Sequence, residues 1–286
     1  MPTHLLAPNF FEFLDQLVLE PAVDPWEHYR RGYLDRHPNF LRAWWAQCFG
    51  RPEEEWADRV RGVRPEHYVL LRELVTQIDL EKMWDDTWAA CRQALPAESR
   101  EPEVYFMVGF FSPDAFVIKV GEDWRIGVGL ERFWDFSRLS VLLAHECCHW
   151  FRRGRGLGGA TTLGERLVEE GMAVGFSRRA QPDRPLPQHL LMPTSQFNTL
   201  QRYETLLWEQ IEPDLSSADT KVIQRALYGL VRRRGTGAPL PSRAGVYLGW
   251  RLVEEYAAQS QRPWSEVLAT AAEEILAGRQ AQSGQK

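Results

Sequence analysis

The segment SVLLAHECCHWF, residues 140–151, constrains this chain more than any other part of its sequence. Apolar residues at helical spacing around it predict a helix over about residues 137–153. Successive side chains on a helix are about 100° apart, so His145 and His149 project from one face and can reach the same metal ion. Glu146 lies at the edge of that face, where its carboxylate can hydrogen-bond a water on the metal but is not easily a ligand.

Two cysteines fill the free positions between the histidines. Cys147 points to the opposite side of the helix, and we expect it to pack there as a small buried residue. Cys148 lies on the far flank, where a thiolate near the metal could compete as a ligand or make the site sensitive to oxidation. The role of Cys148 stays open at this point.

A second helix is predicted from GERLVEEGMAVGFSRR, residues 164–179. Thr162 and Glu165 have the spacing of a capping box, so this helix should begin near residue 163. Glu170 shares its face with an apolar stripe, where an unpaired carboxylate would be costly. A metal would explain that position, and we therefore favour Glu170 as the third ligand, with Glu169 as the competitor.

Two glycines, Gly171 and Gly175, follow these glutamates on the same predicted helix. Because glycine has no side chain, they leave room for a neighbouring helix to approach closely. We expect that neighbour to be the helix that carries the histidines. The GRGLGG connection at residues 154–159 follows a helix rather than a strand, which argues against a dinucleotide site.

Charge and composition limit the partners of the chain. Its 286 residues carry a formal net charge of -5, which argues against nucleic acid as a partner. The RRRG run at residues 232–235 is interpreted as a solvated patch. The N-terminus has no signal-peptide pattern and no stretch is apolar enough to cross a bilayer, so we expect a cytoplasmic protein without a membrane partner. Four cysteines without framework spacing predict no disulfides.

Three regions are expected along the chain. Residues 1–98 are predicted to be an N-terminal helical region, whose tryptophans and tyrosines form core and interhelix contacts. The runs VYFMVG, DAFVIKV and WRIGVGL then predict a small antiparallel sheet. Helical periodicity returns up to residue 277. The predicted fold is therefore α+β and mainly helical, with a core at residues 99–279 and a flexible tail at 280–286.

The chain also resembles a known family. HECCH, followed after twenty residues by EGMA, is similar to the gluzincin pattern, and DPWEHYRRGYLDRHP, RAGVYLGWRLVEEY and EVLATAAEEILAG resemble a domain-of-unknown-function family of predicted zinc-dependent proteases. The resemblance implies a zincin-like core with His145, His149 and Glu170 as zinc ligands and Glu146 as general base. It also implies that Tyr247 donates a hydrogen bond to the developing oxyanion, and that WRIGVGL is an edge strand that pairs with an extended substrate.

These observations together predict a metallopeptidase with one Zn²⁺ per chain, acting on a peptide or protein. Three protein ligands leave one position for water, the arrangement of a catalytic zinc. The alternative is a zinc-binding regulatory or sensor protein without proteolytic activity. The third hypothesis is a helical interaction module without metal. The sequence leaves open the cleaved bond, endopeptidase or exopeptidase action, latency of the site and the oligomeric state.

Overall fold

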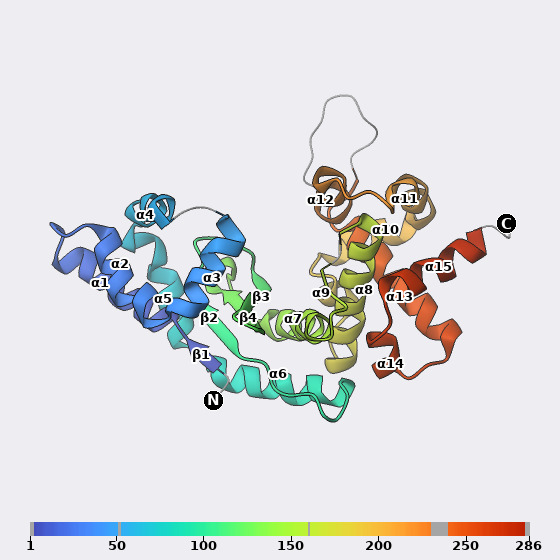
Figure 1. The fold of residues 1–286 in the computed structure, drawn as a ribbon, viewed down its shortest axis with the longest axis horizontal. Helices are drawn as coiled ribbons and strands as arrows, with labels where there is room; N and C mark the ends of the chain where they lie inside the picture. Colours follow the sequence, from blue (N-terminus) through green and yellow to red (C-terminus); the bar gives the residue numbers. More distant parts are fainter. Residues whose placement is uncertain (1–2, 51–52, 160, 230–239, 284–286) are drawn as a thin grey trace. The chain divides into compact units, whose positions relative to one another are not determined.

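The computed structural model describes residues 3–50, 53–159, 161–229 and 240–283. In these ranges the chain forms many helices and one small sheet (Figure 1), which confirms the mainly helical α+β fold. None of the helices described has both the length and the apolar character that a bilayer-spanning segment needs.

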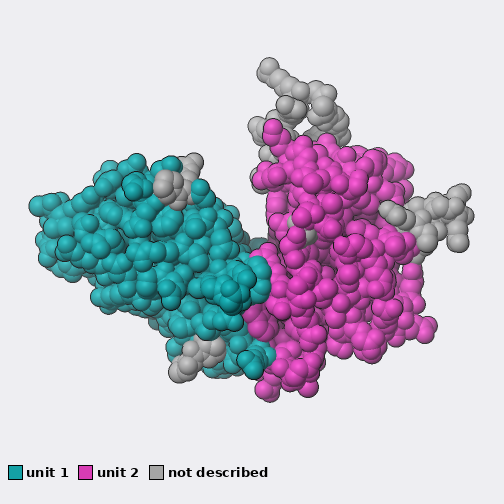
Figure 2. Space-filling model, in the orientation of Figure 1, with its two compact units in different colours: residues 1–86, 100–140 teal, residues 87–99, 141–286 magenta. Residues whose placement is uncertain are grey.

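Two compact units make up the fold, and Figure 2 shows each in its own colour. Unit 1 comprises residues 1–86 and 100–140, and unit 2 comprises residues 87–99 and 141–286. This division differs from the boundary expected near residue 98. The difference arises because the sheet clusters with the N-terminal helices rather than with the helix that carries the histidines.

Unit 1 contains a helical layer whose aromatic side chains form its core. Trp44, Trp45 and Tyr29 are fully buried, and the indole N–H of Trp45 donates to the Tyr29 hydroxyl at 3.1 Å. The tryptophans are therefore core residues, as expected. The helices of this unit are α1 (Ala7–Leu19), α2 (Pro25–Gly32), α3 (Pro38–Phe49), α4 (Glu53–Arg61) and α5 (Val69–Thr76), and α6 (Leu80–Ala94) contributes residues to both units.

The sheet of unit 1 has the strand order β1-β2-β4-β3. Its strands are β1 (Thr3–Leu5), β2 (Val104–Met107), β3 (Ala115–Val120) and β4 (Asp123–Gly129). Only β3 and β4 pair in antiparallel fashion, whereas β1 with β2 and β2 with β4 are parallel. The sheet is thus mixed. The expectation of an antiparallel sheet was wrong, because β2 pairs in parallel with both β4 and the short strand β1.

Strand β4 lies inside the sheet, between β2 and β3. Neighbouring strands therefore already occupy the hydrogen-bonding groups on both sides of it. The expectation that WRIGVGL forms an edge strand that pairs with substrate was wrong. The edges of this sheet are β1 and β3.

Unit 2 is helical and contains the two helices singled out from the sequence. The histidine helix is α7 (Leu139–Gly154), and the glutamate helix is α8 (Leu163–Ala180). The predicted capping box at Thr162 and Glu165 is present in full at the start of α8. The remaining helices are α9 (Leu186–His189), α10 (Thr194–Arg202), α11 (Glu204–Ile211), α12 (Thr220–Tyr228), α13 (Ala244–Ser260), α14 (Trp264–Leu268) and α15 (Ala272–Ser283).

The C-terminal helices differ from the sequence expectation. The single helix expected over residues 263–277 is divided into α14 and α15. Buried Arg152 of α7 donates to the carbonyl oxygens of Leu268 and Thr270 at 2.7 and 3.0 Å, which occupies carbonyls at the break. Helix α15 continues to Ser283, into the expected tail. The RRRG run at residues 232–235 lies outside the described residues.

Two glycines bring α8 and α13 into backbone contact. A Cβ atom on Gly171 would lie 2.1 Å from the carbonyl oxygen of Gly249, and one on Gly249 would lie 1.9 Å from that of Leu167. A Cβ on Gly175 would lie 2.8 Å from the Trp264 ring. The expectation that these glycines accommodate the histidine helix was therefore wrong, since they accommodate α13 and α14.

Candidate metal centre

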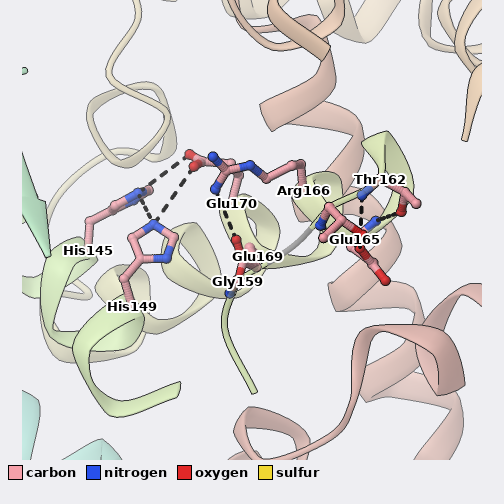
Figure 3. Close-up of polar contacts among 9 residues, drawn as sticks. His145, His149, Gly159, Thr162, Glu165, Arg166, Glu169 and Glu170 are labelled. Atoms are coloured by element: carbon pink, nitrogen blue, oxygen red, sulfur yellow. Dashed lines mark hydrogen bonds and ion pairs between the residues drawn. The ribbon is translucent and has the colours of Figure 1, made fainter. Parts of the chain in front are cut away.

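Three side chains from two helices of unit 2 converge, as Figure 3 shows. The Nε2 atoms of His145 and His149 are 3.1 Å apart. The Glu170 oxygens lie 3.6 Å from Nε2 of His145 and 3.8 Å from Nε2 of His149. The histidines come from successive turns of α7, as their spacing predicts, and Glu170 comes from the middle of α8.

The geometry of this cluster suits a zinc ion. Zinc bound to nitrogen and oxygen at about 2.0–2.1 Å in a regular tetrahedron requires ligand atoms roughly 3.3 Å apart. The three separations, from 3.1 to 3.8 Å, bracket that value. Two imidazoles and one carboxylate also form a donor set that zinc commonly takes. These three residues could therefore hold a metal ion without a rearrangement of either helix.

Electrostatics keep His149 and Glu170 in the protonation states that a metal needs. Burial and the nearby His145 lower the pKa of His149 to about 3, which leaves its imidazole neutral. Burial alone would raise the pKa of Glu170, but the imidazoles and the guanidinium of Arg243 hold it below its usual range. A neutral imidazole and an ionised carboxylate are the metal-binding forms of these side chains.

The neighbouring Glu169 has a different role in the structure. Its carboxylate accepts a hydrogen bond from the backbone N–H of Gly159 at 2.9 Å and from Arg166 at 3.2 Å (Figure 3). It thereby connects α8 to the segment that follows α7. These contacts support the choice of Glu170 over Glu169 as the third ligand candidate.

Glu146 follows the first histidine on α7 and is almost fully buried. Its charge acts on the thiols of both motif cysteines and on the phenol of Tyr228. Glu146 is thus a buried carboxylate next in sequence to the first histidine, and it is outside the ligand set, which comprises His145, His149 and Glu170 among the residues described.

Both motif cysteines are fully buried free thiols. Burial raises the pKa of Cys147 well above its usual value, and its thiol hydrogen-bonds Cys91 of α6. Cys147 therefore packs behind the helix, as expected from the sequence. Burial also raises the pKa of Cys148, so its thiolate form, the one that binds metals, is disfavoured.

The structure argues against the role expected for Tyr247. Its ring is 1% exposed, and its hydroxyl donates to Glu204 of α11 at 2.5 Å. Gly249, two positions further on α13, faces α8. Residues two apart on a helix point about 200° away from each other, so Tyr247 points away from the glutamate helix. We therefore withdraw Tyr247 as the oxyanion donor.

Sequence reasoning did not single out Tyr228, the last residue of α12. The charge of Glu170 is the largest influence on its phenol, and with burial it raises the pKa of Tyr228 to about 12. Nothing in the local sequence marks this residue, apart from the glycine that ends its helix. Helix α12 packs against α8, the helix that carries Glu170.

Comparison with known proteins agrees with these observations. The model of a family described as "Predicted Zn-dependent protease (DUF2268)" matches residues 125–277, which is more than half of the chain. The chain belongs to this family. The matched range includes α7, α8 and all three candidate ligands. No curated protein and no solved structure gives a significant match.

Proposed function

We propose that this protein is a zinc-dependent peptidase of the gluzincin type, with one zinc ion held by His145, His149 and Glu170. The observation that supports this most is the convergence of these three ligand groups at zinc-like separations, with Glu146 next to the first histidine. The family description supports the same proposal.

The residues of the site have separate roles in the proposed hydrolysis. A zinc ion bound by three protein ligands supplies a position for water, lowers the pKa of that water to about 7 and polarises a carbonyl group. Glu146 removes a proton from the attacking water and then delivers it to the nitrogen of the departing amine. The water oxygen bonds to the carbonyl carbon and the C–N bond breaks, which yields a carboxylic acid and an amine; the acid then loses its second water-derived proton to the solvent or to the amine.

The decisive experiment is the substitution Glu146→Gln. Glutamine keeps the shape of the side chain but cannot accept the proton, so bound zinc should stay near one per chain. Cleavage of a peptide library should fall by at least about 100-fold, as for a lost acid-base group. Glu122→Gln is the matched control, because Glu122 is 96% exposed in unit 1 and should leave both zinc content and cleavage unchanged.

Other outcomes would contradict the proposal in different ways. Cleavage by Glu146→Gln at the wild-type rate would show that another group acts as the base. Loss of zinc from this variant would make Glu146 a ligand or a structural support. A wild-type protein that holds zinc but cleaves no library peptide would instead be a zinc-binding protein of another kind.

A further inference from the structure

Unit 1 contains an apolar cavity of about 570 Å³. Its walls come from β1, the start of α1, the end of α5 and the segment that leads into α6, all labelled in Figure 1. Its volume falls within the range of about 300–1,000 Å³ that is typical of ligand sites. The main apolar residues of its lining are Leu5, Ala7, Phe11, Val75, Leu80 and Phe106. The cavity can therefore hold a bulky apolar side chain.

Strand β1 borders this cavity and is an edge of the sheet. The N–H of Leu6 donates to the carbonyl oxygen of Phe106 at 2.8 Å, so His4 and Leu6 direct their backbone groups towards β2. Successive residues of a strand alternate in this respect, and the N–H and C=O of Leu5 therefore face away from β2. Within the described part of the chain, no hydrogen bond involves these two groups of Leu5.

The opposite edge of the sheet, β3, has a side chain on its outer backbone groups. The side-chain amide of Gln47 on α3 donates to the carbonyl oxygen of Lys119 at 2.8 Å and accepts from the N–H of Lys119 at 3.4 Å. Proteins commonly cover an exposed edge, because it can pair with another chain. Leu5 has no such cover among the residues described, so β1 can accept a further strand.

The sheet register relates this edge to the cavity. Leu5 is paired with Phe106 of β2, so their side chains lie on the same face of the sheet, and both residues line the cavity. A residue opposite Leu5 on an added strand directs its side chain to the same face. That side chain would enter the cavity. Free backbone groups beside a side-chain pocket are the combination by which proteins bind peptides through strand addition.

The charged residues of the lining are both acidic, Asp79 and Glu81. Asp79 is exposed and Glu81 is half-buried, and neither takes part in an ion pair within the described ranges. Asp79 accepts a hydrogen bond from the backbone N–H of Lys82, whose ammonium group is paired with Asp86 at 2.7 Å. Two uncompensated carboxylates favour a basic group on the occupant. They disfavour a fatty acid, whose carboxylate has the same charge.

We propose that this site of unit 1 binds an extended peptide as an additional strand beside β1. The peptide backbone forms hydrogen bonds with the N–H and C=O of Leu5, and an aromatic or large aliphatic side chain opposite Leu5 occupies the cavity. A lysine or arginine two positions along the peptide shares that face and lies near Asp79 and Glu81. This inference goes beyond the proposed peptidase function and holds whether or not the protein cleaves peptides.

The probe for the test is the fluorescent peptide Lys-Thr-Phe-Thr-Lys, blocked at both ends. It has a lysine two positions from the phenylalanine in either strand direction. Fluorescence anisotropy measures its binding to the zinc-loaded Glu146→Gln protein, which should leave the probe intact. A probe with alanine in place of phenylalanine should bind at least about tenfold more weakly, because burial of the ring is lost.

Two other probes test the backbone pairing and the charge. N-methylation of the phenylalanine and of the next threonine removes N–H groups that can donate to Leu5, so binding should weaken about fivefold or more. A probe with glutamates in place of both lysines should also bind about threefold more weakly or worse, since like charges then meet at Asp79 and Glu81.

A substitution that fills the cavity tests the location. Val75 lines the cavity, so Val75→Trp should weaken binding by at least about tenfold and remove the difference between the phenylalanine and alanine probes. Val69→Trp is the matched control, because Val69 is on the same helix, is 55% exposed and does not line the cavity. It should leave binding unchanged. Should Val75→Trp fail to fold, the probe series still tests the site.

Several results would overturn the proposal. Absence of measurable binding, or equal binding to Val75→Trp and Val69→Trp, would show that no peptide occupies this cavity. Binding that is insensitive to N-methylation would rule out strand addition. Tighter binding of dodecanoate than of the probe would make the cavity a site for apolar small molecules instead. Cleavage of a peptide library by the wild type tests the proposed function separately, so either proposal can fail alone.

Discussion

Replacement of Gly249 by alanine tests how the contact between α8 and α13 positions Glu170, the proposed third ligand. The new Cβ atom would lie 1.9 Å from the Leu167 carbonyl oxygen, and real Cβ atoms do not approach closer than 3.0 Å. The obstacle is backbone, so no side chain can rotate away. The helices must therefore separate by roughly 1 Å or more, which moves Glu170 on α8 relative to its surroundings.

The size of the effect follows from this displacement. Overpacking costs about 1–3 kcal/mol, and a clash with backbone belongs at the upper end of that range. At about 2–4 °C per kcal/mol for a protein of this size, the melting temperature should fall by about 6–12 °C. Zinc sites tolerate deviations of about 0.2 Å in ligand distances, so a shift of the Glu170 carboxylate should also weaken zinc binding by about tenfold or more.

Calorimetric unfolding and zinc titration against a competing chelator measure both effects. Gly278→Ala is the matched control, because Gly278 is a helical glycine of the same unit whose added Cβ would meet the Tyr256 ring at an ordinary 3.8 Å. That variant should be as stable as the wild type or slightly more so, since alanine is the better helix former. A Gly249→Ala protein with wild-type stability and zinc affinity would show that the close crossing does not position the ligand.

Two further predictions concern single side chains of unit 2. In the same chelator titration, Glu170→Gln should weaken zinc binding by about 100-fold or more, whereas Glu169→Gln should weaken it much less. Equal losses of affinity, or the reverse order, would contradict the ligand assignment. Burial lowers the pKa of His189 to about 4. Between about pH 6.5 and pH 4 the imidazole is therefore protonated in the unfolded chain but neutral in the folded protein, so the free energy of unfolding falls as the pH falls through that range. The wild type should therefore lose more stability over that range than His189→Gln, and parallel melting-temperature profiles would refute this.

The part of the site that the sequence could predict depends on the spacing of residues along single helices. The two histidines depend only on the 100° rotation per residue of one helix, and α7 has the expected bounds to within two residues. Glu170 could be chosen because a carboxylate on an apolar face requires a partner. The capping box likewise involves only residues three apart, and it marked the start of α8 correctly.

Contacts between distant segments account for what the sequence did not predict. The antiparallel hairpin of β3 and β4 is local, but the parallel pairing of β1 with β2 joins residues about a hundred positions apart. The interior position of β4 follows from its own parallel pairing with β2, on the side opposite β3. Gly171 correctly indicated a close contact between helices. The local sequence does not identify the partner helix, which is α13.

The orientation of Tyr247 shows why helix faces matter for assigning catalytic roles. Tyr247 lies near the start of α13, in a segment chosen because it resembles the family pattern. The helix, however, directs Gly249 towards α8 and Tyr247 towards Glu204. The same close contact that brings α13 to the glutamate helix therefore directs this phenol away from it. The hydroxyl of Tyr247 is therefore buried and already bonded to a carboxylate.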